Sequence, residues 1–384
     1  MRAHFLSLLC LPILALSVQA QWDLQNSHST ASLRGIDNVG GGVAWASGTN
    51  GTVLRTEDGG HRWETCAVPT EAQELDFRGI QAFDVDTAIV MSSGKGDLSR
   101  LYKTTDGCKT WKLVFTNPDK DGFWDAVRID KEKPQVVMAN WANQMYGVLI
   151  GDPVNRIFSI WETHDTGSHW ERFNADDTKH QPKSEKDESL FAASNEALAV
   201  PGNNAGFTFV TGGGSTRICS GSAHSPLDAA YWIAVDCNRL PFPLWPGAGA
   251  FALGTRAVTG SHGESYHDVL VVGGDYGHPS VQSPTLFFPG IPRVLLGYKR
   301  GQQSATPPRG YRSSVAYDDA TKTWITVGPN GTDISRDDGK NWMPLEPGAL
   351  DQPDADKNWN ALSLPFVVGS NGRIGKLRED ALKW

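Results

Sequence analysis

An octapeptide that places aspartate, glycine and tryptophan at fixed offsets occurs four times along the chain and constrains its fold more than any other feature. The pattern is Ser/Thr-x-Asp-x-Gly-x-x-Trp, with Cys108 in the place of the glycine in the second copy. The copies are Thr56–Trp63, Thr104–Trp111, Thr163–Trp170 and Ser335–Trp342. Recurrence of this kind indicates a fold built from similar supersecondary units that stack on one another.

Each position of this motif, which we call the Asp-box, suits a tight hairpin turn. The aspartate accepts hydrogen bonds from backbone amides of the turn, and the hydroxyl residue braces the same loop. The glycine adopts a backbone angle that residues with a Cβ resist, and the tryptophan buries a large ring between sheets. We therefore interpret the following residues as structural and not catalytic: Asp58, Trp63, Asp106, Trp111, Asp165, Trp170, Asp337 and Trp342.

A second repeated phrase supports the hairpin interpretation. Gly48–Thr52, Gly328–Thr332 and Gly369–Arg373 each follow an apolar run and contain Asn-Gly. Asn-Gly between two strand-like runs is a strong short-range signal for a hairpin. The first two phrases also match glycosylation sequons, but the third lacks the threonine, so we interpret all three as turns.

The two phrases together predict an all-β fold, a seven-bladed β-propeller with Asp-box repeats, in a single domain over residues 21–384. Blade seven is short, and the N-terminal segment 22–29 can supply its missing outer strand. Segment 302–309 is expected to be a loop, and two packed β-sandwiches are the alternative architecture. The blades are expected at about residues 32–66, 77–116, 122–173, 190–243, 249–298, 309–346 and 358–378.

The first twenty residues have the features of a secretory signal peptide. A short segment with Arg2 precedes an apolar run from Phe5 to Val18, and small residues follow at a cleavage site. We therefore expect an exported protein, periplasmic or extracellular. Four cysteines remain in the mature chain, and an oxidising compartment permits disulfides in three possible pairings. Cys219 with Cys237 is the favoured pair, because 18 residues can separate neighbouring strands of one blade.

Charge and hydropathy exclude two classes of partner. The formal net charge is −8, whereas a nucleic-acid binder shows a basic face. No stretch after the N-terminal segment approaches the roughly 20 apolar residues of a membrane helix. We expect a monomer that neither binds nucleic acid nor inserts into a membrane.

The chain resembles a known family over nearly all of its mature length. Leu33–Ile36, Gly48–Thr52 and Thr56–Trp63, in that order, are similar to the photosystem II stability and assembly factor family of Asp-box (BNR) propellers. Three further phrases, Phe191–Asn195, Val271–Tyr276 and Arg309–Ser313, resemble an exported bacterial branch of that group, sometimes labelled oxidoreductases. The resemblance implies a propeller that binds another protein and catalyses no known reaction. A shared fold does not transfer a role.

Sequence motifs for enzyme chemistry are absent. Dinucleotide binding needs Gly-x-Gly-x-x-Gly between a strand and a helix, whereas Gly40–Gly42 and Gly212–Gly214 occur among strands and turns. No nucleophile elbow and no His-Glu-x-x-His metal motif occurs. His262, His267 and His278 share a loop-rich region, but their spacing fits surface histidines. We predict no catalytic residue, no cofactor and no metal.

The start of each innermost strand carries the candidate binding site, because these positions form a ring at one mouth of the central channel. Arginine forks suit carboxylates, so we expect the mouth to bind a protein, or the acidic group of a peptide or glycan. In the alternative, each arginine pairs with a local carboxylate such as Asp37 or Asp125 and only ties blades together. Phe191 and Phe251 fill two places of the ring. The candidate ligand-binding residues are Arg34, Arg78, Trp124, Asp125, Tyr311, Arg312 and Asn360.

The alternative function is a glycan-acting hydrolase on the same fold. A sialidase-like site would use three arginines with Tyr311 and Glu188, but the sialidase Arg-Ile-Pro opening is missing. A xyloglucanase-like site needs two opposed carboxylates, for which Asp125 and Asp275 are the candidates. The sequence favours an exported, non-catalytic binding or assembly-scaffold propeller over either enzyme.

Overall fold

The computed structural model describes the chain in nine segments and folds it into seven antiparallel sheets. Two short 3-10 helices, η1 (Thr70–Ala72) and η2 (Gly96–Leu98), lie between the strands of the described residues. No described helix is long and apolar enough to cross a membrane. The described residues are 21–131, 145–173, 181–200, 206–222, 235–260, 265–292, 301–348, 351–352 and 354–383.

The first three sheets each contain four strands, which follow one another in chain order from the first strand to the outermost. Blade 1 consists of β2 (Leu33–Gly40), β3 (Val43–Gly48), β4 (Thr52–Thr56) and β5 (Glu64–Thr65). Blade 2 consists of β6 (Phe77–Ala82), β7 (Thr87–Ser92), β8 (Arg100–Thr105) and β9 (Lys112–Thr116). Blade 3 consists of β10 (Trp124–Ile129), β11 (Gly147–Val154), β12 (Ile157–Thr163) and β13 (Glu171–Arg172).

The next two sheets are joined by hydrogen bonds. Blade 4 consists of β15 (Leu198–Ala199), β16 (Gly206–Val210), β18 (Arg217–Ser222) and β19 (Asp236–Arg239). Blade 5 consists of β20 (Ala248–Thr259), β21 (Ser265–Asp275), β22 (Leu286–Pro292) and β23 (Gln302–Gln303). Two short strands extend the sheet of blade 5: β14 (Glu188–Ser189), which precedes blade 4, and β17 (Gly212–Gly213), which lies between β16 and β18 in the chain.

The last two sheets complete the set. Blade 6 consists of β24 (Ser314–Asp318), β25 (Thr323–Gly328), β26 (Gly331–Ser335) and β27 (Met343–Pro344). Blade 7 consists of β28 (Trp359–Ser363), β29 (Phe366–Gly369), β30 (Ile374–Leu377) and the N-terminal strand β1 (Trp22–Gln25).

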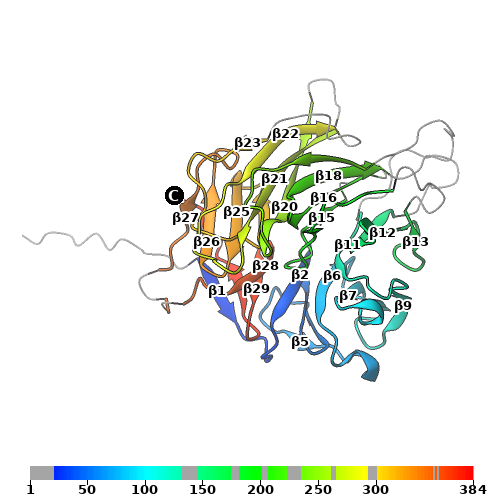
Figure 1. Ribbon diagram of the computed structural model, residues 1–384. Helices are drawn as coiled ribbons and strands as arrows, with labels where there is room; N and C mark the ends of the chain where they lie inside the picture. Colours follow the sequence, from blue (N-terminus) through cyan, green and yellow to red (C-terminus); the bar gives the residue numbers. More distant parts are fainter. Residues whose placement is uncertain are drawn as a thin grey trace, which may run out of the picture.

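The first strands of the seven sheets form a closed ring. β2 contacts β6 and β28, β10 contacts β6 and β15, and β20 contacts β15 and β24. A contact between β24 and β28 completes the circle. These seven strands are therefore innermost, and each sheet runs outward from them, as Figure 1 shows. The predicted seven-bladed propeller is confirmed.

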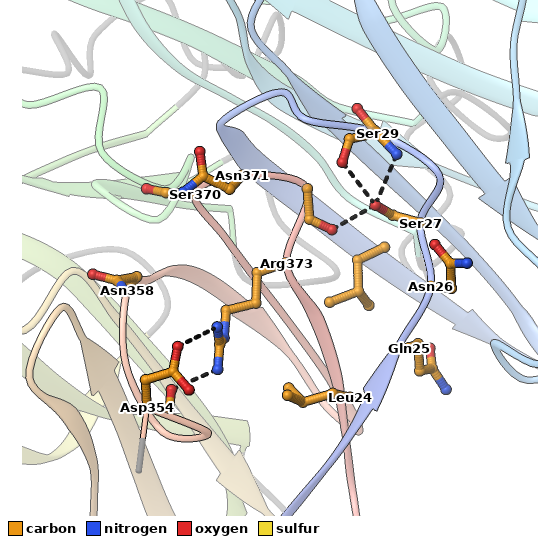
Figure 2. A pocket seen from close by; sticks show the side chains of 12 residues that line it. Leu24, Gln25, Asn26, Ser27, Ser29, Asp354, Asn358, Ser370, Asn371 and Arg373 are labelled. Atoms are coloured by element: carbon orange, nitrogen blue, oxygen red, sulfur yellow. Dashed lines mark hydrogen bonds and ion pairs between the residues drawn. The ribbon is translucent and has the colours of Figure 1, made fainter. Parts of the chain in front are cut away.

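The ring is closed by a strand from the N-terminus. β1 pairs with β30 over Trp22–Gln25, so that the two ends of the chain share one sheet (Figure 1). The Trp22 ring lies 6.0 Å from the Trp359 ring, and its Nε1 donates to Thr332 Oγ1 of blade 6 at 3.0 Å. Beyond β1, Ser27 Oγ donates to the Gly372 carbonyl at 2.5 Å, as Figure 2 shows.

The Asp-box turns share one hydrogen-bond pattern. In the first box, Thr56 Oγ1 donates to Asp58 Oδ1 at 2.9 Å and accepts from the Gly60 amide at 3.0 Å. The same Asp58 oxygen accepts from the Arg62 amide at 2.9 Å. The other three boxes repeat all three bonds. The residue at the glycine position has φ between 60° and 88° in all four, which favours glycine.

The Asp-box tryptophans contact the preceding blade. Trp63 packs edge-on against Phe366 at 5.6 Å, and Trp111 against Trp45 at 6.5 Å. Trp342 Nε1 donates to Thr285 Oγ1 of blade 5 at 2.9 Å. A turn that anchors its own hairpin thus also places a large ring between two sheets, where aromatic burial is most stabilising.

Two disulfides reinforce the ring. Cys219–Cys237 links β18 to β19 within blade 4, where the two residues are direct strand partners, so the favoured pairing is confirmed. Cys66–Cys108 joins the end of blade 1 to the Asp-box turn of blade 2. Cys108 stands at the glycine position with φ 60°, so the one box without glycine there is tied covalently to its neighbour.

The structure differs from the sequence prediction in one segment, and a second predicted segment lies outside the described residues. Segment 302–309, expected to be a loop, contributes the outermost strand of blade 5, because Gln302 and Gln303 pair with Phe287 and Leu286. Side chains at this exposed edge carry no alternating apolar pattern, so no strand signal is visible in the sequence. The predicted signal peptide, residues 1–20, lies outside the described residues.

Ring closure gives a stability prediction. Trp22→Ala should lower the free energy of unfolding by roughly 3–5 kcal/mol, because it empties a buried site between β1, blade 7 and blade 6. Urea unfolding followed by circular dichroism measures this. Leu24→Ala, on the same strand at a side chain 47% exposed, is the matched control and should cost less than about 1 kcal/mol. Equal losses for both variants would show that β1 is not a closing strand.

Candidate functional site

One local distortion positions the side chains at the channel mouth. In five blades the innermost strand slips by one residue against its neighbour at its start, and the extra residue is left unpaired. Such β-bulges re-aim a side chain away from the regular sheet. The five extra residues are equivalent around the ring: Arg34, Arg78, Asp125, Phe251 and Asn360.

Arg34 and Arg78 share one carboxylate. Arg78 Nε donates to Asp76 Oδ2 at 2.7 Å, while Arg34 Nε lies 3.6 Å from Asp76 Oδ1 and has no hydrogen-bond partner. Burial, and next the neighbouring Arg78, lower the pKa of Arg34 from its ordinary value. Both arginine side chains remain 28–29% exposed. Two guanidiniums therefore face one carboxylate at an open position.

The second acidic group of the mouth, Asp125, is buried. Asp125 is 1% exposed and its Oδ2 has no hydrogen-bond partner. Burial raises the pKa of Asp125 well above its usual range, with a further contribution from Asp152, although Arg78 opposes the shift. Burial therefore disfavours the charged form of this carboxyl. Among Arg34, Arg78 and Asp76, two groups are positive and one is negative, although the chain as a whole carries −8.

An aromatic cluster lies beside the arginines. Phe191 and Phe251 stack in parallel with ring centroids 4.0 Å apart, and Tyr311 packs edge-on against Phe251 at 4.6 Å. Tyr276 packs edge-on against both phenylalanines and is 60% exposed. Arg34 and Tyr311 interact electrostatically, so the cluster adjoins the cationic pair. The mouth thus combines positive charge with an exposed ring.

Arg312 does not reach the mouth, which corrects the sequence prediction. It is 0% exposed and forms a buried ion pair with Asp333, which also pairs with Arg309 at 3.2 Å. Blade 6 is offset by one residue from the predicted alignment, so that Ser313 takes the place corresponding to Arg34. Arg312 corresponds to Leu33, a core position. Because Arg312 matches Arg34 and Arg78 in residue type, an alignment of the blades by sequence hides this offset of one residue.

Two other predicted binding residues have structural contacts. Trp124 is 0% exposed and stacks on Phe115 at 5.3 Å inside the wedge between blades, so it cannot meet a ligand. Asn360 Nδ2 donates to the Leu33 carbonyl at 2.7 Å and joins blade 7 to blade 1. The suggested arginine partners also differ from those found. Asp37 accepts from Gln81 and Lys131, and the mouth arginines use Asp76 instead.

The carboxylates named for a hydrolase are engaged elsewhere. Glu188 is held by two hydrogen bonds from Arg217, at 2.7 and 2.6 Å, and one from Thr211. Asp275 accepts from Trp245 Nε1 at 2.9 Å and from the Gly277 amide at 2.8 Å, and the His278 ring lies 2.7 Å from it. These contacts lower the pKa of Asp275 against the opposing effect of burial. Both carboxylates are therefore engaged in hydrogen bonds within the fold.

Segment 190–197, whose structural role the sequence did not predict, crosses the channel behind the mouth. Asn195 Nδ2 donates to the carbonyls of Ile80 and Val127, at 3.3 and 3.0 Å, and its Oδ1 accepts from the Val127 amide at 2.8 Å. Ser194 Oγ donates to the Ser313 carbonyl at 2.6 Å. Segment 190–197 therefore links blades 2, 3 and 6 across the axis. Asn195 has φ 65°, and a lone asparagine is a weak sequence signal for this.

The next residue of that segment is a buried acid. Glu196 Oε2 accepts from Ser314 Oγ at 2.6 Å and from the Val315 amide at 3.0 Å. Burial raises the pKa of Glu196 to about 7, although Arg128 and these hydrogen bonds oppose the shift.

Among the described residues, no cluster of three or more histidine, cysteine or acidic side chains is arranged to hold a metal ion. His262 lies outside the described residues. A separate polar pocket of 290 Å³ lies where β1 joins blade 7 (Figure 2). Its Arg373 is held against Asp354 and over the Trp359 ring, so it belongs to the ring closure.

Comparison with protein-family models gives no match, and comparison with curated proteins gives none either. Solved structures do match. YCF48 bound to a D1 peptide shares 16% identity at a TM-score of 0.57, covering 95% of this chain and 100% of that one. YCF48 from Cyanidioschyzon merolae shares 17% at a TM-score of 0.60, covering 94% and 100%.

A GH74 xyloglucanase from Xanthomonas campestris is also similar, with 15% identity and a TM-score of 0.53. The match covers 94% of this chain and 54% of the xyloglucanase. At these identities the likenesses establish the propeller fold. They confirm the fold that the resemblance to the photosystem II assembly factors implied.

The buried ion pair of blade 6 gives a stability prediction. Arg312→Ala should cost roughly 3 kcal/mol, because Asp333 is left buried with only Arg309 as its partner. Arg309→Ala removes a half-exposed partner of the same carboxylate and should cost about 1 kcal/mol or less. Urea unfolding of both variants measures the difference. Equal costs would contradict the core assignment of Arg312.

Glu196 gives a pH prediction. In the unfolded chain its carboxyl titrates near 4.5, and in the folded protein near 7. The unfolded chain therefore releases this proton first as pH rises, and the folded state loses stability from about pH 4.5 up to about pH 7. Glu196→Gln removes that loss, so its stability relative to wild type should rise across this window by at most about 3 kcal/mol.

Urea unfolding at about pH 4 and about pH 8 measures the effect of Glu196→Gln, because these values bracket the window. Glu74→Gln, at an exposed glutamate, is the control and should behave as wild type at both values. A constant difference between Glu196→Gln and wild type would refute the assignment.

Proposed function

We propose that this protein is a non-catalytic binding or assembly-scaffold propeller that holds an acidic segment of another protein at the channel mouth. The proposal depends on the unequal numbers of guanidinium and carboxylate groups at the channel mouth. Arg34 and Arg78 share Asp76, and Arg34 Nε has no hydrogen-bond partner. A carboxylate from outside would supply the missing acceptor, and charge-assisted bonds of this kind are the strong ones.

The surroundings favour a peptide over a free anion. The exposed Tyr276 ring stands on the stacked Phe191 and Phe251 rings, which hold it in place. A rigid aromatic side chain beside a cationic pair suits an acidic residue with apolar neighbours, because aromatic and arginine side chains dominate protein interfaces. The similar propeller YCF48 has been solved with a D1 peptide bound, which is a use of the same fold for peptide binding.

The proposed compartment is outside the cytoplasm. Support comes from the apolar N-terminal segment and from the two disulfides, Cys66–Cys108 and Cys219–Cys237, which persist in oxidising environments. The glycan hydrolase is the weaker candidate, since Glu188 and Asp275 are held by neighbouring side chains and Asp125 is buried.

The peptide proposal is tested with two fluorescein-labelled peptides of one length. The first alternates Asp and Glu with Leu and Phe, and the second replaces each acid by its amide. The wild type should bind the acidic peptide at least tenfold more tightly, since hydrogen bonds between charged partners contribute about 1.5–3 kcal/mol. Arg34→Ala combined with Arg78→Ala should remove that preference, as measured by fluorescence anisotropy.

Arg62→Ala is the control, because Arg62 is 76% exposed on an Asp-box turn and should leave binding unchanged. A double variant that keeps the preference for the acidic peptide would overturn the site. Turnover of a fluorogenic glycoside that Asp125→Asn abolishes would overturn the non-catalytic function.

A further inference from the structure

Two loops of blade 5 lie at the same end of the sheet as the mouth residues. Segment 241–247 leads into β20, and segment 276–285 follows β21. Ala248 and Asp275, the strand residues next to these loops, are direct partners, and Ala248 precedes the bulge residue Phe251 by three positions. Both loops therefore border the mouth.

These two loops carry half of the exposed large apolar side chains in the described part of the chain. Leu244 and Trp245 on the first loop are 51% and 46% exposed, and Tyr276 and Val281 on the second are 60% and 51% exposed. A concentration of such side chains marks an interaction surface, whereas single ones do not. The other four are spread over blades 2, 6 and 7: Leu24, Leu98, Leu113 and Met343.

Hydrogen bonds hold the two aromatic residues of this surface in place. Trp245 Nε1 donates to Asp275 Oδ2 at 2.9 Å, so the polar edge of the indole is satisfied within the protein. The Tyr276 amide donates to the Gly247 carbonyl at 3.1 Å and joins the two loops. Pro246 restricts the backbone of Trp245, the residue before it. A ligand therefore meets rings that are already ordered, which lowers the entropic cost of binding.

This aromatic surface is continuous with the cationic pair of the mouth. Tyr276 packs edge-on against Phe251 at 6.2 Å, and Phe251 packs against Tyr311 at 4.6 Å. Tyr311 in turn interacts electrostatically with Arg34. Because an extended chain advances about 3.3 Å per residue, a few residues span these ring-to-ring steps. One bound segment can therefore reach both the arginines and the exposed rings.

We infer that Trp245 and Tyr276, which we call the aromatic rim, form a subsite for a bulky apolar side chain close to the acidic residue of the bound peptide. The inference rests on the proposed function and assigns the apolar half of the recognised motif to blade 5. An acidic residue with Leu or Phe nearby matches both the excess of guanidinium at the mouth and the apolar rings beside it. Tryptophan and tyrosine at fixed positions contribute much of the binding energy of protein interfaces.

Two fluorescein-labelled acidic peptides of equal length and charge test the inference. In the first, Asp and Glu alternate with Leu and Phe, and in the second they alternate with Ser and Gln. The wild type should bind the first at least about tenfold more tightly in fluorescence anisotropy, because burial of a Leu or Phe side chain is favourable. Trp245→Ala should weaken binding of the first peptide by about tenfold or more and leave the second unchanged.

Two further variants separate the ring of Trp245 from its structural contact. Trp245→Phe keeps an aromatic ring and removes the hydrogen bond to Asp275, so it should retain most of the preference for the apolar peptide. Equal losses in Trp245→Phe and Trp245→Ala would show that the residue acts by fixing its loop, which would overturn the subsite. Leu113→Ala, at a side chain 43% exposed on the outermost strand of blade 2, is the control and should bind both peptides as the wild type does.

The inference and the proposed function fail in different ways. Equal binding of the two acidic peptides by the wild type, or an equal loss of both in Trp245→Ala, would overturn the aromatic rim and leave the preference for acid over amide intact. Equal binding of the apolar peptide and its amide form would overturn the proposed function, and the inference with it. A dimer in analytical ultracentrifugation that Trp245→Ala disperses would assign the rim to a second copy of the chain and overturn the inference as well.

Discussion

Burial of each sheet between its two neighbours is the constraint on which this structure depends. No single four-stranded sheet has a core of its own, so every blade is stable only when the ring is complete. The Asp-box serves this constraint twice. Its hydroxyl and carboxylate fix the hairpin, as Thr56 and Asp58 do, and its tryptophan enters the space beside the preceding blade, as Trp63 does against Phe366. In the second Asp-box, Cys108 replaces the glycine and forms a disulfide with Cys66, so this turn is attached covalently to blade 1.

The sequence predicted the features that follow from local chemistry. Asp-box spacing and Asn-Gly turns identify hairpins, and a count of hairpins identifies the blades. The bulge residues Arg34 and Arg78 were found because each follows an apolar residue and precedes glycine in a repeated phrase. In contrast, Arg312 was misplaced by one position. A shift of one residue moves a strand side chain to the opposite face, and only the packing of Asp333 against Arg312 reveals it.

Long-range contacts explain what the sequence could not show. Segment 190–197 precedes a blade without an Asp-box, and its composition resembles that of an ordinary loop. Its function as a partition depends on Asn195 reaching Ile80 and Val127, residues that lie more than sixty positions away.

The candidate site at the mouth arises from an imbalance between arginines and carboxylates. In an acidic chain, arginines are available to pair with an excess of carboxylates, and most of them do. At the mouth, burial raises the pKa of Asp125, and two guanidiniums share Asp76. Asp76 does not satisfy both arginines, so Arg34 Nε has no hydrogen-bond partner. A ligand carboxylate at the mouth would complete the pairing that the fold itself leaves open.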